Sequence, residues 1–411
     1  MCFMTFNALH VRILLRSCES ASIKIAQKLF RPCSLKSLWR SSYAQRDRRR
    51  RPPCFTEPER STSGRPLLII IALSLIQAYR LISDFCHILS TALVRGLHSM
   101  PTSVVLATGG FDHTIRFWEA SSGICHRTIQ YPDSQVNALE ISRNKQFIAA
   151  AGNPVARLFD VNGSSSHPLM SFEGHTTNVT SIGFQKNEKW IFTGSEDGTV
   201  KIWDLRAPGC QRSYEAKSLA YVNSVALHPN QGELISGDQN GNIRVWDLTA
   251  DGCSCEMNPG GEFAVRSLSV AADASMIVAA YNTGCCYLWN PKTSESFGGD
   301  RRPESRRIQC HDKYILKCRI SPDVKMLATA SADHTVRLWR LPSFTLEKVL
   351  ASHQWWVWDC VFSADSSYLV TASSDHSARL WDIAQGTTIR HYAGHHKAVV
   401  AVALNDSSLE S

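Results

Sequence analysis

The stretch GSEDGTVKIWDL, residues 194–205, contains the pattern that decides the fold. Asp197 suits a tight turn, because an Asp side chain bonds the nearby backbone. The residues after it alternate between polar and apolar, as in a β-strand, and Trp203 follows the turn residue at a distance of six. The stretch therefore predicts a strand, a turn and a second strand that ends in an aromatic residue.

The same unit recurs along the chain at a nearly constant interval. Successive terminal aromatic residues lie 41, 44, 43, 43, 50 and 42 residues apart, and the longest interval contains the polar, Gly- and Arg-rich segment 294–307. A period of about 40–45 residues with Trp-Asp marks is typical of a four-stranded propeller blade. We predict an all-β, seven-bladed WD-repeat β-propeller over residues 100–408. The seven aromatic residues are Trp118, Phe159, Trp203, Trp246, Trp289, Trp339 and Trp381.

The two ends of the repeat region predict how the ring closes. The first unit begins with VVLATGG, residues 104–110, and has no innermost strand before it. The chain finishes with GHHKAVVAVALND, residues 394–406, which matches such a strand but has no blade after it. We predict that residues 398–404 complete the first blade, because closure leaves no open sheet edge. Truncation of this C-terminal strand should severely destabilise the fold.

Three units carry a His upstream and a Ser eight residues before the Trp. A His-Ser-Asp set raises the hypothesis of hydrolysis, but an enzyme needs one set with an exposed nucleophile and an oxyanion hole. A network that recurs is instead structural, with Asp accepting from His and the indole N–H finding a partner. We therefore predict no enzymatic activity. The sets are His175, Ser195, Asp197 and Trp203; His311, Ser331, Asp333 and Trp339; and His353, Ser373, Asp375 and Trp381.

The innermost strands of all units align on a central apolar residue, which is Val357 in HQWWVWDCVFS, residues 353–363. Side chains alternate along a strand, so the two flanking residues share one side. Most flanking pairs are polar or small, whereas Trp356 and Trp358 occupy this one. These strands begin at the mouth of the central channel, so we predict an exposed protein-binding hot spot. The alternative is that both indoles fill a wide channel; Trp355 fits either interpretation.

Residues 1–99 differ in composition from the rest. They hold 16 of the 44 Lys and Arg residues but 5 of the 36 Asp and Glu residues. The basic excess lies there, so it gives no reason to expect nucleic-acid binding by the repeat region. The uncharged run 67–79 is shorter than the ~20 residues that span a bilayer. We interpret residues 1–99 as a disordered extension or a mis-annotated start; a signal-anchor and an organellar transit peptide are the alternatives.

The 14 cysteines show neither the spacing of a zinc site nor that of a disulfide framework. Reduced thiols are typical of cytosolic proteins. We expect a cytoplasmic protein without cofactor, metal or direct membrane contact.

Several segments go beyond general propeller features. They include YPDSQVNALE (residues 131–140), LHPNQGELISGDQNGNIRVWDL (227–248) and WVWDCVFS (356–363). With them the chain resembles the small WD-repeat subunit of the target of rapamycin (TOR) kinase complexes, the lethal-with-sec-thirteen member eight family, in a plant-like form. The resemblance covers residues 101–405. The basic leader and the additional Trp355 depart from the family pattern.

The resemblance implies a non-catalytic scaffold that supports TOR signalling in growth and nutrient response. It implies binding to the C-terminal lobe of the kinase domain, which the scaffold stabilises while helping to shape access to the catalytic cleft. The family's kinase-facing contacts fall here on Gln135 and Asn137, and on Trp356 and Trp358. Both pairs are among the seven flanking pairs that the strand alignment defines.

A second motif supports a rival hypothesis. Residues 203–206, Trp-Asp-Leu-Arg, match the Trp-Asp-x-Arg box of propellers that act as substrate receptors of cullin-type ubiquitin ligases. The box is short and common, and Arg206 can equally be solvated or paired with an acidic neighbour.

Overall fold

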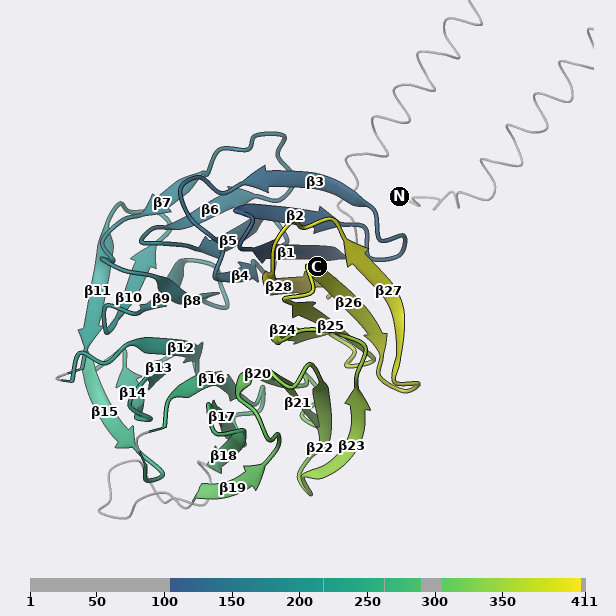
Figure 1. The fold of residues 1–411 in the computed structure, drawn as a ribbon. Coiled ribbons are helices and arrows are strands. Elements are labelled where there is room, and N and C mark those ends of the chain that lie inside the picture. The colour runs from purple at the N-terminus through teal and green to yellow at the C-terminus, as the bar shows by residue number, and fades with distance from the viewer. Residues whose placement is uncertain (1–103, 217, 262, 290–304, 408–411) are drawn as a thin grey trace, which may run out of the picture. The chain divides into compact units, whose positions relative to one another are not determined.

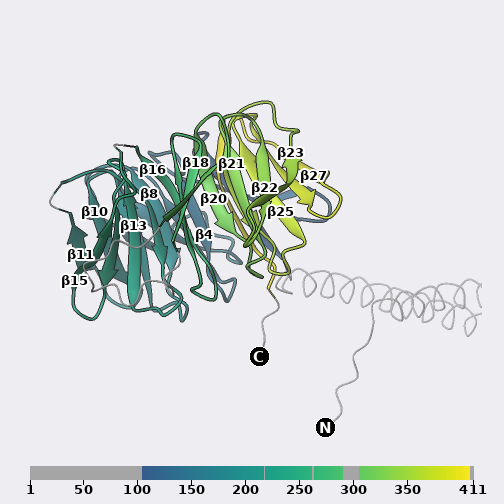
Figure 2. The ribbon, with the colours of Figure 1, turned by 90° about the horizontal axis from the view of Figure 1, so that it is seen from below.

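The computed structural model describes residues 104–216, 218–261, 263–289 and 305–407. Within these ranges, 28 strands form seven four-stranded sheets, which confirms the predicted all-β, seven-bladed propeller. The sheets stand around a central axis, with the innermost strand of each sheet nearest to it (Figures 1 and 2). A search of the described ranges for a helix long and apolar enough to cross a membrane finds none. The predicted extension, residues 1–99, lies outside these ranges.

Blades 1 to 4 are numbered in chain order and described from the innermost strand outward. Blade 1 consists of β28 (Val399–Asn405), β1 (Val105–Gly110), β2 (Thr114–Trp118) and β3 (Cys125–Gln130); blade 2 of β4 (Ala138–Ile141), β5 (Phe147–Ala151), β6 (Ala156–Asp160) and β7 (Met170–Phe172); blade 3 of β8 (Val179–Phe184), β9 (Trp190–Ser195), β10 (Thr199–Asp204) and β11 (Cys210–Glu215); and blade 4 of β12 (Val222–Leu227), β13 (Glu233–Asp238), β14 (Ile243–Asp247) and β15 (Gly252–Met257).

The other three blades continue the series without a change of topology. Blade 5 consists of β16 (Val265–Val270), β17 (Ile277–Tyr281), β18 (Cys285–Trp289) and β19 (Ser305–Gln309); blade 6 of β20 (Ile315–Ile320), β21 (Met326–Ser331), β22 (Val336–Arg340) and β23 (Thr345–Leu350); and blade 7 of β24 (Val357–Phe362), β25 (Tyr368–Ser373), β26 (Ser377–Asp382) and β27 (Thr387–Ala393).

Ring closure joins the two ends of the described chain. The C-terminal strand β28 pairs antiparallel with β1, from Val105 opposite Asn405 to Gly110 opposite Val399. Figure 1 shows the yellow β28 beside the dark blue β1 near the centre of the ring. The predicted closure is confirmed, and blade 1 is complete only when the two ends meet.

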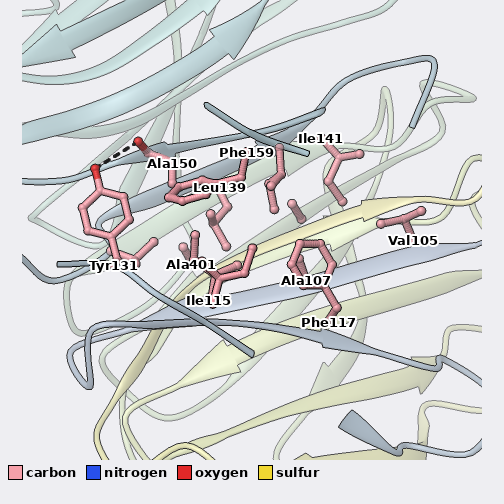
Figure 3. Packing of buried hydrophobic residues seen from close by; sticks show 14 residues of the cluster. Val105, Ala107, Ile115, Phe117, Tyr131, Leu139, Ile141, Ala150, Phe159 and Ala401 are labelled. Carbon is pink, nitrogen blue, oxygen red and sulfur yellow. Dashed lines mark hydrogen bonds between the residues drawn. The ribbon is translucent and has the colours of Figure 1, made fainter. Parts of the chain in front are cut away.

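Apolar side chains fill the spaces between neighbouring blades. Figure 3 shows one such space, in which Phe117 of blade 1 and Phe159 of blade 2 belong to the same buried cluster. Tyr131 contributes its ring to this cluster and donates its hydroxyl to the carbonyl of Ala150 at 3.4 Å. The seven aromatic residues that define the repeat are all buried, each in the third strand of its blade. The sequence repeat is therefore a repeat of inter-blade packing.

A Gly or Ala stands nine residues before each of these aromatic residues, where the next blade approaches closely. A Cβ atom on Gly194 would lie 2.5 Å from Val225, and one on Gly237 would lie 2.5 Å from Val265. Side chains of ordinary size at this position would force the blades apart, because protein interiors are already close-packed. The seven positions are Gly109, Ala150, Gly194, Gly237, Ala280, Ala330 and Ala372.

Candidate functional site

In four blades of the described chain, a buried Asp-His-Thr-Trp network ties the loop before the innermost strand to the turn before the third strand. In blade 3, Nδ1 of His175 lies 2.8 Å from Asp197 Oδ2 and Nε2 lies 2.7 Å from the hydroxyl of Thr193. The indole N–H of Trp203 donates to the same hydroxyl at 2.9 Å. The matching sets are Asp333, His311, Thr329 and Trp339 in blade 6; Asp375, His353, Thr371 and Trp381 in blade 7; and Asp112, His395, Thr108 and Trp118 in blade 1.

The Ser of each predicted set bonds the backbone of the turn, and no hydrogen bond among the described residues joins it to the His or the Trp. Ser195 donates to the carbonyl of Asn178 and accepts from the amide of Asp197, so it secures the turn instead. The linking hydroxyl belongs to the Thr two residues earlier, because that side chain points into the blade toward the indole. The missed signal is a Thr ten residues before each Trp. Ser331 and Ser373 bond the backbone in the same way as Ser195.

The network of blade 1 was not predicted, because its His comes from the opposite end of the chain. His395 precedes β28, and its Nδ1 lies 2.9 Å from Oδ2 of Asp112. Burial raises the pKa of the Asp112 carboxyl, but hydrogen bonds from His395 and Thr114 outweigh it and leave the pKa well below its usual range. The charged network therefore helps to hold the ring closed.

A β-bulge follows the central apolar residue of the innermost strand in six blades of the described chain. In blade 7, Val357 is opposite Ser373 and Asp359 is opposite Ala372, so Trp358 is the extra residue. A bulge re-aims its side chain, so the strict alternation predicted for the flanking pairs does not hold. The seven residues that follow the central residues all line one cavity of about 470 Å³: Asn137, Thr180, Asn223, Arg266, Leu316, Trp358 and Val400.

Three polar residues of this set bind to the next blade. The side chains of Asn137, Thr180 and Asn223 each donate to the carbonyl of the central residue of the following blade, at 3.0, 2.6 and 2.8 Å. Asn137, predicted as a kinase contact, is thus engaged within the ring. Its predicted neighbour Gln135 donates to Asn178 Oδ1 at 3.4 Å and is half-buried.

The two predicted Trp residues lie in unlike surroundings. Trp358 is half-buried, and its indole N–H donates to the hydroxyl of Ser374 at 2.6 Å. Trp356 is 40% exposed, and its indole N–H donates to no group of the described residues. Their ring centroids are 5.8 Å apart. The indoles neither fill the channel together nor both emerge into solvent: Trp358 lines the cavity, whereas Trp356 packs against Trp358 and is exposed.

A third ring, which the sequence analysis missed, extends this pair. Phe111 is in the turn between β1 and β2, is 38% exposed and meets Trp358 edge-on with centroids 6.2 Å apart. We call Phe111, Trp356 and Trp358 the aromatic cluster. Because β24 contacts β28 and β28 contacts β4, blades 7, 1 and 2 are consecutive in the ring. Phe111 therefore comes from the blade between the two predicted contact pairs.

Other exposed aromatic residues precede innermost strands in other blades. Tyr221, Phe263 and Tyr314 are exposed, but the described residues place no other aromatic ring against them. Trp355 is 60% exposed and faces His334 rather than the cluster. Within the described ranges, only around Phe111 do two exposed rings join a half-buried one in a single cluster.

The Arg of the Trp-Asp-x-Arg box is paired with the Asp of the same motif. Arg206 is exposed, and its guanidinium forms an ion pair with Asp204 at 2.6 Å. This is the paired state that the sequence analysis set against a ligase role.

Comparison with known proteins matches five stretches to the family described as WD domain, G-beta repeat: residues 80–119, 166–204, 208–247, 303–340 and 344–382. The target of rapamycin complex subunit LST8-1 of Arabidopsis thaliana is 59% identical over 252 residues, which are 61% of this chain and 82% of that protein. The target of rapamycin complex subunit wat1 of Schizosaccharomyces pombe is 56% identical over 306 residues, 74% of this chain and 96% of that protein.

A further Arabidopsis thaliana protein, named as a non-functional target of rapamycin complex subunit LST8-2, is 50% identical over 253 residues, 61% of this chain and 80% of that protein. None of these three names supports the ubiquitin-ligase hypothesis. With seven blades, the closure strand and identities of 50–59% over 80–96% of the length of these relatives, the chain belongs to the LST8 family of WD-repeat proteins.

Proposed function

We propose that this chain is a non-catalytic scaffold subunit of a TOR complex, and that it binds the C-terminal lobe of the TOR kinase domain. The names of its relatives support a place in such a complex. One relative at 50% identity is named non-functional, so family membership alone does not carry the proposal. The observation that carries it is the aromatic cluster, with its two exposed rings at the channel mouth.

The cluster has the chemistry of a protein-binding hot spot. The indole N–H of Trp358 is already bonded to Ser374, so its ring offers an apolar surface. Trp356 offers apolar surface and a free donor. Large aromatic residues with a polar edge are enriched among residues that dominate binding energy. The kinase segment that fits here has an apolar side chain for the rings and a hydrogen-bond acceptor for Trp356.

Such a subunit acts by stabilising its partner. A protein that binds only the folded kinase domain raises the stability of that domain in proportion to its occupancy. It would do so in the cytoplasm and reach endomembranes only through the complex.

The test compares two neighbouring Trp residues. Trp356→Ala should weaken binding to the purified kinase domain by at least ~2 kcal/mol, roughly 30-fold, as expected for truncation of a central anchor. The melting temperature of the Trp356→Ala variant should equal that of wild type, since Trp356 is exposed. Affinity is measured by biolayer interferometry and melting by calorimetry.

Trp355→Ala is the matched control, because Trp355 is more exposed and lies outside the cluster. It should bind like wild type. Equal binding by both variants would refute the proposed face. Trp358 is a poorer test, because removing it also leaves Ser374 without its partner.

A further inference from the structure

We propose that the kinase binds only the closed ring, so that kinase binding and the pairing of β1 with β28 stabilise each other. This inference rests on the proposed function and adds a consequence to it. It follows from the origin of the cluster: Phe111 comes from the first described blade strands, whereas Trp356 and Trp358 precede or begin β24, near the other end of the chain.

The turn that carries Phe111 is held by the C-terminal segment that completes its own blade and by the next blade in the ring. The amide of Phe111 donates to the carbonyl of Ala398, directly before β28, at 3.0 Å. On the other side, the amide of Val136 donates to the carbonyl of Gly110 at 3.2 Å. The turn is also tight, because a Cβ atom on Gly110 would lie 2.3 Å from the carbonyl oxygen of Ala398.

The next residue of the turn makes the strongest connection to the C-terminal strand. Asp112 accepts from the backbone amide of His396 at 3.1 Å and lies 2.9 Å from the ring of His395. His395 in turn contacts the hydroxyl of Thr108 in β1 at 2.7 Å. Hydrogen bonds to charged groups are stronger than neutral ones. Separation of β28 from β1 would break all of these contacts together.

Loss of closure would therefore dismantle the binding face as well as blade 1. Phe111 would lose the strand that holds it against Trp358, and Gly110 would lose its position beside Val136. A partner that needs all three blades then binds the closed ring alone. Such a partner stabilises closure by mass action, and the coupling works equally in the other direction.

Hydrogen exchange measures this coupling directly. We compare the free chain with the same chain saturated with purified kinase domain, by mass spectrometry. Amides in β1 and β28 that the partner does not cover should exchange at least about tenfold more slowly in the complex, because local opening is suppressed. Strands β16 and β17 of blade 5, on the far side of the ring, are the internal control and should change by less than about twofold.

A pair of Phe variants tests the composite face. Phe111→Ala should weaken kinase binding roughly tenfold, as expected for an interface aromatic. Phe263→Ala is the matched control, since Phe263 is 46% exposed and has no aromatic neighbour among the described residues. It should bind like wild type, and both variants should melt like wild type.

The outcomes separate this inference from the proposed function. If Trp356→Ala weakens binding but Phe111→Ala does not, or if protection rises equally in every blade, the coupling to closure is wrong while the kinase-binding face stands. If both Phe111→Ala and Trp356→Ala bind the kinase like wild type, the proposed kinase-binding function itself is refuted.

Discussion

At the channel mouth, blades 2, 3 and 4 use the position after the central apolar residue differently from blades 7 and 1. In the first group, the polar arc, Asn137, Thr180 and Asn223 each bond the backbone of the next blade. In the second group, the closure arc, Trp358 and Val400 occupy this position, and the described residues give neither side chain such a bond. The same backbone site thus bonds neighbouring blades together in one arc and carries apolar side chains without such a bond in the other.

Blade 7 of the closure arc bonds the next blade through the residue one position further along the strand. In blade 4, the hydroxyl of Ser224 accepts from the amide of Leu268 in the next blade at 3.0 Å. In blade 7, this acceptor is the carboxylate of Asp359, which accepts from the amide of Val402 at 3.1 Å and lies 3.4 Å from the ammonium of Lys317. A neutral hydrogen bond between blades is therefore replaced by a charged one where the ring closes. The difference teaches that the bond between blades at this position is charged beside the exposed rings and neutral in the polar arc.

The largest effect should come from removing the closure strand itself. A chain that ends at residue 394 lacks β28 and His395, so blade 1 cannot form and Asp112 loses its partner. The loss should exceed the ~5–15 kcal/mol that holds a typical domain together. We expect no cooperative melting by circular dichroism. A chain that ends at residue 407 is the control and should melt like wild type.

The next largest effect on stability comes from removing one inter-blade hydrogen bond in each arc. Asp359→Ala leaves the Val402 amide unbonded and the Lys317 charge unpaired, so it should cost about 3–5 kcal/mol. Ser224→Ala removes the corresponding neutral acceptor in the polar arc and should cost about 1–3 kcal/mol. Urea denaturation measures both. Equal costs would show that the charged tie is no stronger than the neutral one.

A smaller effect tests the division of roles at the bulge. Thr180→Val keeps the shape of the side chain but removes its bond to the next blade, so it should cost about 1 kcal/mol of stability. Kinase affinity should stay within a factor of two, since Thr180 is outside the aromatic cluster. A large loss of kinase binding would contradict the distinction between the arcs.

The smallest expected effect is on how the melting temperature changes at acidic pH. Burial raises the pKa of Asp112 and Asp197, but hydrogen bonds from His395 and His175 lead the opposing contributions and lower both pKa values well below the usual range. A lowered pKa means that the carboxylate stabilises the fold above about pH 4 and that this contribution is lost as the pH falls further. Asp112→Asn and Asp197→Asn should each flatten the fall of melting temperature between pH 5 and pH 3.

Both substitutions should flatten this fall to a similar extent, because the Asp-His-Thr-Trp network is the same in the two arcs. A flattening in only one of them would mean that the arcs differ in their networks as well as at the channel mouth. Calorimetry at each pH gives the measurement.

Much of the candidate site was accessible from the sequence. Alignment of the innermost strands placed Trp356 and Trp358 at the channel mouth, because repeating units of equal length superimpose. It could not show that a bulge separates their environments, since a bulge is an irregularity of strand pairing. Phe111 was not predicted, because a residue in a turn belongs to no periodic pattern that would mark it.

The sequence by itself determined the repeat, the number of blades and the buried aromatic residue of each one. These follow from local periodicity, since each unit of about 43 residues carries its own strands and its own Trp or Phe. Only the tertiary structure decided which residues meet where the ring closes. Asp112 and His395 are 283 residues apart, and nothing short of a closed ring brings them, or Phe111 and Trp358, into contact.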